Sequence, residues 1–305
     1  MKKKSRYILG ILLGVCVLVG GIKIAERSTS RVLHITRAKD YPADEWTITQ
    51  YGPRDINSMF YTIYNPQNGL IVIDGGWTED GPFVRETVEA LGGKADAWIL
   101  THPHLDHISA FASLYPDLRG IEIGDIYTVD MASPEKCQKR AKWDSVDAYR
   151  EFLALEVEDL KYVYPGDVLN ICGLEVDIFN AYDEHVEELS KDYLNDGSMM
   201  FKIKGETQSV LFCADVGKRM SDYLLETWGD DLKADYIQMG HHGNGGLLAD
   251  FYTKVSPEVA FFDAPDWLMY DTTGNYTTPE NSELMESLGS EVVSFHTQPN
   301  SVILR

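Results

Sequence analysis

The stretch AWILTHPHLDH, residues 97–107, places four potential metal ligands directly after a short apolar segment. The apolar beginning predicts a buried strand, and the end of the stretch predicts the start of a helix. His102 and His104 are two residues apart, so they point to the same side of an extended segment. Asp106 and His107 begin the predicted helix and can turn toward the same cavity. Imidazole nitrogens combined with a carboxylate suit zinc, iron or manganese better than calcium.

Strands and helices alternate on both sides of this stretch. The residues indicate strand hairpins, and helices between groups of strands, which favours sheets packed face to face with helices outside. The predicted strands are residues 60–64, 70–74, 97–100, 121–129, 174–181, 199–204, 209–214, 236–239, 259–263, 292–296 and 302–304. The predicted helices are residues 82–91, 107–114, 217–227, 247–253 and 279–288, and residues 134–161 form a charged helical insert.

Length and composition indicate one globular domain after an N-terminal segment. The chain has 305 residues, of which 44% are hydrophobic and 25% charged, and these values exclude a disordered or fibrous protein. The formal charge is −21, and it is uneven, because residues 1–27 hold six basic residues and one acidic residue. The remainder carries −26, so it has no broad basic surface for a nucleic-acid backbone. Nucleic acid is therefore an unfavoured partner.

The N-terminal segment predicts a membrane anchor. Residues 7–22 are almost all apolar, basic residues precede them, and Lys23 can extend to the membrane surface. The basic residues place the N-terminus in the cytoplasm and the rest of the chain outside. A cleaved secretory signal is the alternative, although the exit around Ala25 is a poor cleavage site. We therefore expect residues 1–30 to be an anchor or signal segment and residues 31–305 to be an extracytoplasmic domain, held by a single-pass anchor or secreted.

Three further segments resemble the motifs of a known family. IVIDGG at residues 71–76, VLFCADV at residues 210–216 and YIQMGHHG at residues 236–243 are apolar runs that lead into Asp74, Asp215 and a histidine pair. With His-x-His-x-Asp-His, this order resembles the metallo-β-lactamase superfamily across almost the whole body. The resemblance implies an α/β (α+β) fold, a four-layer αββα sandwich of two mixed sheets with outer helices. It also implies that Asp74 supports the histidine stretch.

The same resemblance implies two divalent metal ions, with zinc favoured and manganese or iron as alternatives. His102 and His104 would hold one ion, Asp106, His107 and His241 the other, and Asp215 would lie between them. His241 and His242 could exchange roles. Two such ions about 3.5–4 Å apart activate a shared water for attack on an ester. Besides Asp106, we expect His242 to take part in catalysis by donating a hydrogen bond or proton to the substrate, or else to be structural.

One ligand of the lactamase and glyoxalase branches has no counterpart. Their further histidine precedes the strand of Asp215, where this chain has Asn195 in the turn NDGSMM, and His185 is a distant substitute. Asn195 with Gly-His-His-Gly resembles the branch of the ComEC hydrolase domain and of phosphorylcholine esterase. That branch continues with Gly-His-Pro, where residues 275–279 read NYTTP. The substrate therefore cannot be transferred from the branch.

Aromatic residues flank the predicted centre. Trp77 follows the turn after Asp74, and Trp267, Tyr270 and Tyr276 lie on the loop after the strand at residues 259–263. They serve either as substrate contacts, together with Asn195, or as packing. Aromatic faces attract quaternary ammonium groups, which fits choline phosphodiesters.

The leading hypothesis is a membrane-tethered, metal-dependent hydrolase of a small-molecule or cell-surface phosphoester, with a phosphorylcholine-type diester as one form. The alternatives are a nuclease of DNA uptake and a non-catalytic, metal-containing surface binding module. The acidic body argues against the nuclease. The intact set of predicted ligands argues against the binding module.

Overall fold

The computed structural model describes residues 42–52, 55–294 and 300–305, and Pro42–Arg305 form one compact unit. The predicted membrane segment lies outside the described residues, so the anchor, the 1–30 and 31–305 division and the location of the protein stay predictions. A helix long and apolar enough to cross a membrane is not found among the described residues.

The described strands form two seven-stranded sheets. The first has the order β14-β1-β2-β3-β4-β5-β6 and the second the order β13-β12-β11-β10-β9-β8-β7. The strands of the first sheet are β1 Trp46–Gln50, β2 Phe60–Asn65, β3 Gly69–Asp74, β4 Lys94–Ile99, β5 Glu122–Val129, β6 Leu160–Val163 and β14 Asn300–Leu304. Those of the second are β7 Val168–Ile171, β8 Leu174–Asn180, β9 Met200–Lys204, β10 Ser209–Phe212, β11 Tyr236–Gln238, β12 Val259–Phe262 and β13 Glu291–Ser294.

Each sheet combines an antiparallel and a parallel part. β14, β1, β2 and β3 are antiparallel neighbours, whereas β3 to β6 run parallel. In the second sheet β7 to β10 are antiparallel and β10 to β13 parallel. Because the carboxyl ends of parallel strands meet at one edge, β3 and β4 deliver their following loops together, and so do β10, β11 and β12. These two edges position the candidate site.

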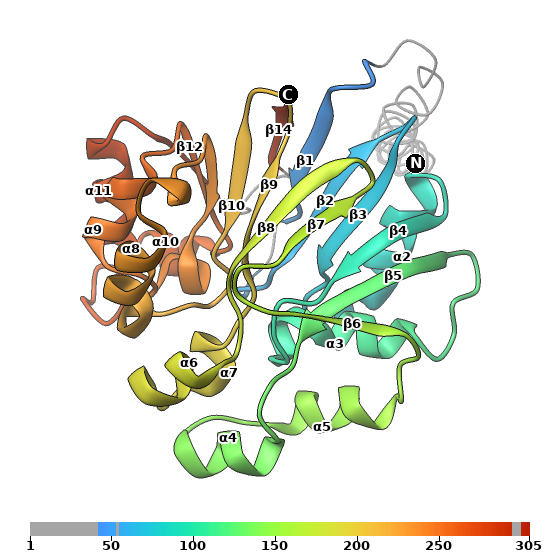
Figure 1. Ribbon diagram of the computed structural model, residues 1–305, viewed down its shortest axis with the longest axis horizontal. Helices are drawn as coiled ribbons and strands as arrows, with labels where there is room; N and C mark the ends of the chain where they lie inside the picture. The colour runs from blue at the N-terminus through green and yellow to red at the C-terminus, as the bar shows by residue number, and fades with distance from the viewer. Residues whose placement is uncertain (1–41, 53–54, 295–299) are drawn as a thin grey trace, which may run out of the picture. The chain divides into compact units, whose positions relative to one another are not determined.

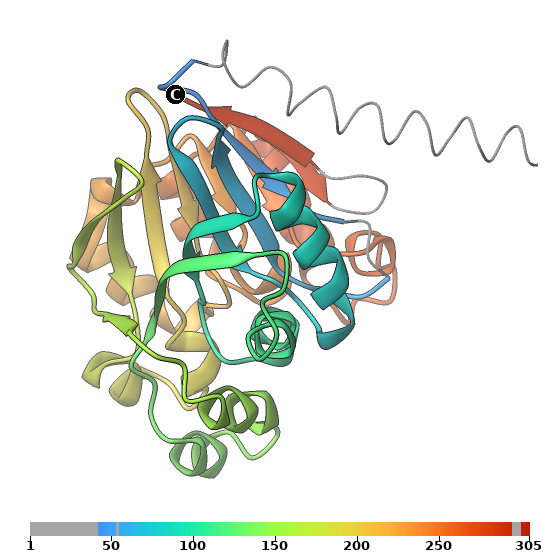
Figure 2. The same cartoon turned by 90° about the vertical axis from the view of Figure 1, so that its right-hand side faces the viewer.

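Helices cover the outer faces of both sheets. The described helices are α2 Gly81–Ala90, α3 Leu105–Leu114, α4 Pro134–Arg140, α5 Asp147–Ala154, α6 Glu184–Leu189, α7 Tyr193–Asp196, α8 Ser221–Trp228, α9 Ala249–Val255, α10 Asp266–Met269 and α11 Thr278–Ser287. α2 packs on β4 and α3 on β3, while α8 packs on β8 and α11 on β13. Figure 1 shows the strands between α2 and α3 on one side and α8, α9 and α11 on the other. Figure 2 shows α2 and α3 in front of the first sheet. The predicted sandwich of two mixed sheets with outer helices is confirmed.

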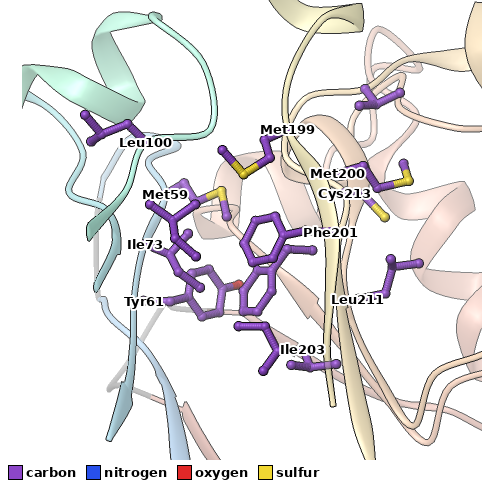
Figure 3. Close-up of a cluster of buried hydrophobic side chains, with 14 of the residues drawn as sticks. Met59, Tyr61, Ile73, Leu100, Met199, Met200, Phe201, Ile203, Leu211 and Cys213 are labelled. Atoms are coloured by element: carbon purple, nitrogen blue, oxygen red, sulfur yellow. The ribbon is translucent and has the colours of Figure 1, made fainter. Parts of the chain in front are cut away.

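The core lies between the facing sheets. Tyr61 of β2 meets the ring of Phe212 in β10 edge to face, with 5.2 Å between ring centroids, and Phe201 of β9 stacks on Phe212 at 5.1 Å. Figure 3 shows Met59, Tyr61 and Ile73 of the first sheet side opposite Met199 and Phe201 of the second. Burial of these aromatic and aliphatic side chains is the main favourable contribution to folding. The strand ends that carry the site residues are therefore held in place by a well-packed core.

The structure corrects several predicted elements. The insert at residues 134–161 is not helical throughout, because its end pairs with β5 as β6. β1 and β7 were not predicted as strands, and the turn around Asn195 contains the short helix α7. β1 alternates buried and half-buried residues, a period-two pattern that five residues express weakly. β4 begins at Lys94, three residues before the predicted strand.

Candidate metal centre

Asp74 holds the histidine stretch in place. At the end of β3 its Oδ1 accepts a hydrogen bond from Thr101 N at 2.8 Å, and its Oδ2 accepts one from Thr101 Oγ1 at 2.7 Å. His107 Nδ1 also lies 2.7 Å from Asp74 Oδ2, and both side chains are fully buried. This contact leaves His107 Nε2 to point away from Asp74, toward Asp215 Oδ1 at 3.3 Å. The structure thus gives Asp74 the supporting contacts that the resemblance implied.

A first group of ligand atoms comes from His102, His104 and Asp215, whose atoms lie within 4.8 Å of one another. His102 Nε2 is 3.1 Å from His104 Nδ1 and 3.8 Å from Asp215 Oδ2. His102 and Asp215 are buried, and His104 is nearly so. β4 ends at Ile99, before these histidines, and α3 begins after them at Leu105. The extended segment between the two elements therefore points both rings the same way.

Asp144 contacts the same group from the insert. Its Oδ2 lies 2.9 Å from His104 Nε2, the ring nitrogen that faces away from His102. Asp144 follows α4 and precedes α5, so the charged insert reaches the candidate centre. A carboxylate on the second ring nitrogen fixes the tautomer and orientation of a ligating histidine. Sequence reasoning missed this residue, because an acid in a charged insert carries no local signal.

A second group comes from Asp106, His107 and His242, whose ligand atoms also lie within 4.8 Å of one another. His242 Nε2 is 3.1 Å from Asp106 Oδ2 and 3.5 Å from Asp215 Oδ2. Asn57 Nδ2 donates a hydrogen bond of 2.6 Å to Asp106 Oδ2 and orients this carboxylate. Asp215 therefore faces both groups, and Asn57 is a second contact that the sequence did not indicate.

The two consecutive histidines point in different directions. His241 and His242 have φ values of 52° and 57°, in the left-handed region, and Gly243 follows with φ 85°. A Cβ at residue 243 would lie 2.2 Å from the ring of Phe262, so the turn requires glycine there. The side chain of His242 is 4% exposed and that of His241 38%. Of the two, His242 joins Asp106 and His107, while His241 Nε2 stays 3.7 Å from Asp215 Oδ2 at the solvent side.

Burial and opposite charges set the protonation preferences of the site. Burial and the neighbouring His107 hold the pKa of His102 well below its usual value. Burial also disfavours the charged form of His107, but the carboxylates of Asp215 and Asp74 outweigh it and raise its pKa well above the usual value. Burial likewise opposes ionisation of Asp106, yet the hydrogen bond and charge of His242 lower its pKa to about 2. The carboxylates are thus stabilised as anions by facing cations.

The donor set fits divalent metal ions. His107 Nε2 and Asp215 Oδ1 are buried, and within the described part of the chain neither makes a hydrogen bond. Buried polar atoms of this kind are rare unless a ligand, ion or water satisfies them. Each group offers two imidazole nitrogens and a carboxylate oxygen, the set that zinc, iron or manganese takes in proteins. His102, His104 and Asp215 are therefore able to hold one ion, and Asp106, His107 and His242 another.

Two of the predicted substrate residues meet on one loop beside Asp106. Trp77 Nε1 donates to Asn57 O at 2.7 Å, and Trp267 Nε1 donates to Asp55 O at 2.9 Å. Trp267 also packs edge to face on Tyr276, with 5.5 Å between centroids. The structure thereby brings together aromatic residues that are about 190 positions apart in the chain. Tyr270 is 65% exposed.

Asn195 lies near the histidine stretch through its turn. Met199 N donates to Thr101 O at 2.9 Å, which joins the turn to the start of the stretch. Asn195 Nδ2 donates to Asp192 Oδ2 at 3.1 Å, and its Oδ1 is buried without a hydrogen bond to any described residue. His185 is not part of either ligand group, because it pairs with Asp183 at 3.0 Å and stacks on Tyr223.

Comparisons with known proteins support the fold. The family model described as the metallo-beta-lactamase superfamily matches residues 51–117, which include Asp74 and the histidine stretch. No curated protein sequence matches the chain. The structure is similar to CmlA, a diiron beta-hydroxylase from Streptomyces venezuelae, with a TM-score of 0.54 and 14% identity over 86% of this chain and 55% of that chain. The chain thus spans about half the length of CmlA.

A second solved structure matches along its whole length. The metallo-beta-lactamase fold protein YhfI from Bacillus subtilis has a TM-score of 0.52 and 13% identity, over 85% of this chain and 100% of that chain. None of these matches singles out the ComEC or phosphorylcholine esterase branch, which stays a prediction. The two sheets and these structural matches show that the chain has the metallo-beta-lactamase fold, and residues 51–117 match the model of that superfamily.

Proposed function

We propose that this protein is a dinuclear metal-dependent hydrolase that cleaves a phosphodiester. The observation that carries the proposal is that Asp215 faces two buried ligand groups, one with His102 and His104 and one with His107. A hydrolase of this kind needs two cations side by side with a shared carboxylate between them. When bound, a pair of divalent ions neutralises phosphoryl charge and lowers the pKa of water toward neutrality.

The residues of the chain have separate tasks in this proposal. Asp74 and Asn57 fix the directions of His107 and Asp106, so that the nitrogen and oxygen ligands are oriented before substrate binds. His242, which is buried, acts as a ligand. His241 is the partly exposed neighbour, and its Nε2 would donate a proton to the leaving oxygen. From the sequence we expected His241 to be the ligand and His242 the proton donor. The proposal reverses these two roles, an alternative that the sequence left open.

The aromatic residues beside Asn57 favour a substrate that carries a cationic group. Trp267 and Tyr276 pack together, and Trp77 and Trp267 both donate to the loop that carries Asn57. Such faces attract quaternary ammonium groups, by about 0.5–2 kcal/mol per ring. The acidic body adds long-range attraction for a cation and repels nucleic acid. A phosphorylcholine-type diester at the cell surface combines these properties, and the apolar run at residues 7–22 would tether the enzyme beside it.

The test is an activity panel with metal counting on one preparation of the full chain. We expect about two zinc or manganese ions per chain and turnover of bis-p-nitrophenyl phosphate and p-nitrophenylphosphorylcholine. Asp215→Ala should lose bound metal and activity, whereas Asp222→Ala, which removes an exposed acid on α8, should change neither.

Three results would contradict the proposal. A preparation that holds two ions yet turns over no phosphoester would exclude this hydrolase, and fewer than one ion per chain would favour a binding module. Salt-sensitive cleavage of single-stranded DNA would favour the nuclease. Membrane fractionation of cells with and without residues 1–30 would test the tether separately.

A further inference from the structure

A buried glutamine holds the turn that carries Asp215. Gln238 is the last residue of β11, and its Oε1 accepts hydrogen bonds from Cys213 N at 3.0 Å and from Ala214 N at 2.7 Å. These amides follow β10 directly, and Cys213 N also donates to the backbone oxygen of Gln238 at the longer distance of 3.4 Å. Ala214 has φ 45°, a left-handed conformation that costs free energy in a residue other than glycine. The two hydrogen bonds therefore stabilise a strained turn immediately before Asp215.

The other side of the same amide faces a buried acid. Gln238 Nε2 donates to Asp263 Oδ2 at 2.9 Å and to Met239 O at 2.7 Å. Asp263 Oδ1 accepts from Gln50 Nε2 at 2.8 Å and from Tyr61 OH at 2.6 Å. Gln50 and Tyr61 belong to β1 and β2, so this carboxylate joins the two sheets behind the candidate centre.

The polarity of this chain of contacts is fixed by the acid. An ionised carboxylate has only acceptor oxygens, so the amide group of Gln238 must turn its NH2 toward Asp263. Its oxygen then has to face the amides of Cys213 and Ala214. Burial raises the pKa of Asp263 to about 6, so the group is still an anion at neutral pH. In an asparagine at residue 263 the oxygen would accept from Gln50 and Tyr61, so its NH2 group would face the NH2 group of Gln238, a donor against a donor.

We propose that Asp263 is a positioning residue that fixes the orientation of Gln238 and, through it, the strained turn that presents Asp215 to both ligand groups. Asp263 itself is not a member of either group. Only the consequence for metal binding rests on the proposed function, because it requires Asp215 to be a ligand. The orientation of the turn does not depend on it.

The experiment compares three variants of the full chain with the wild type. Asp263→Asn reverses the polarity at Gln238, and we expect zinc affinity, measured by competition with a chelating dye, to fall about 10- to 100-fold. Asp263→Asn with Gln238→Glu restores the match, because a carboxylate at residue 238 accepts both from the backbone amides and from the new amide at residue 263. Zinc affinity should then recover in part, since that carboxylate cannot donate to Met239 O. Tyr61→Phe removes one donor to the carboxylate of Asp263 without touching Gln238 and is the control, with unchanged zinc affinity.

Hydrogen exchange of the metal-free proteins measures how well the turn before Asp215 is ordered. Peptides that contain the Ala214 amide should exchange faster in Asp263→Asn and return toward the wild-type rate in the double variant. Unchanged exchange in Asp263→Asn, or a double variant no better than the single one, would overturn the proposal. If Asp263→Asn does not fold, recovery of folding in the double variant supports the same polarity and its absence counts against it. A wild type that binds no zinc would refute the metal centre, while the exchange data still decide the role of Asp263.

Discussion

The two edges that meet at the candidate centre are built in opposite ways. On the first edge, His102 to His107 lie in six consecutive residues, and one acid from the neighbouring strand, Asp74, supports them. On the second edge, Asp215 and His242 come from the ends of two strands, and their support comes through Gln238 and Asp263. The first edge is a local motif held by a few tertiary contacts, whereas the second exists only after β10, β11 and β12 have assembled. Substitutions should therefore affect the two edges differently.

The largest effect is expected at Asp74, the fully buried support of the first edge. Asp74→Asn places an amide against Thr101 and His107, which both donate to the present carboxylate. We expect a loss of about 3–5 kcal/mol in the free energy of unfolding, because a buried ionic contact loses its partner. Urea unfolding in chelator measures this. Asp96→Asn is the control, because this acid is 29% exposed, pairs with Lys94 and accepts from Leu70 N, a bond that an amide oxygen can keep, so the loss should be much smaller. Similar losses at both positions would contradict the comparison.

The second edge should show a pH dependence that comes from Asp263. Burial raises its pKa to about 6 in the folded protein, above the usual value of 3.8. Between pH 3.8 and pH 6 the folded state keeps a proton on Asp263 that the unfolded state has lost. The stabilisation of the folded state by this protonated carboxyl is therefore complete below pH 3.8 and is lost as the pH rises through 6. The free energy of unfolding of the wild type, relative to Asp263→Asn, should fall by about 2–3 kcal/mol from pH 3.5 to pH 7.5. Urea titrations in chelator at both pH values would show a flat difference if Asp263 titrated normally.

A smaller effect is expected at Asp144, the outer contact of the first edge. Asp144→Ala removes the carboxylate on His104 Nε2, and zinc affinity should fall about 10- to 100-fold with little change in the fold. Asp147→Ala is the matched control, because this exposed acid belongs to the same insert and pairs with Arg150 rather than with a histidine. Equal zinc affinities in competition titrations of the two variants would mean that the insert does not orient the ligand.

The smallest effect concerns the aromatic residues that bridge the two edges. Trp77 comes from the first edge and Trp267 from the second, and both donate to the loop of Asn57. Trp267→Ala should raise KM for a phosphorylcholine ester about threefold to thirtyfold, because it removes one cation–π contact. KM for the isosteric neutral 3,3-dimethylbutyl ester should not change. An equal rise for both esters would indicate lost packing rather than recognition of charge.

What the sequence could predict follows the same division. The histidine stretch, Asp74 and Asp215 were all visible as short motifs at strand ends, and the sandwich of two mixed sheets followed from the family resemblance. Asp144, Asn57 and the pair Gln238–Asp263 were not visible, because each acts across 25 or more positions and no local pattern marks it. The choice between His241 and His242 depends on two successive left-handed residues, a backbone conformation that the letters GHHG do not specify.

The contact between Asp144 and His104 would also let a native tryptophan report on metal binding. Trp143 is 71% exposed and is bonded directly to Asp144, so an indole stands one residue away from a ligand contact. An ion bound by His104 would also hold the peptide that carries this indole, because the other ring nitrogen of His104 lies against Asp144. Emission from Trp143, isolated by subtracting the spectrum of Trp143→Phe, would follow metal loading without a dye or a substrate. The insert would then signal the state of a centre to which it contributes no ligand.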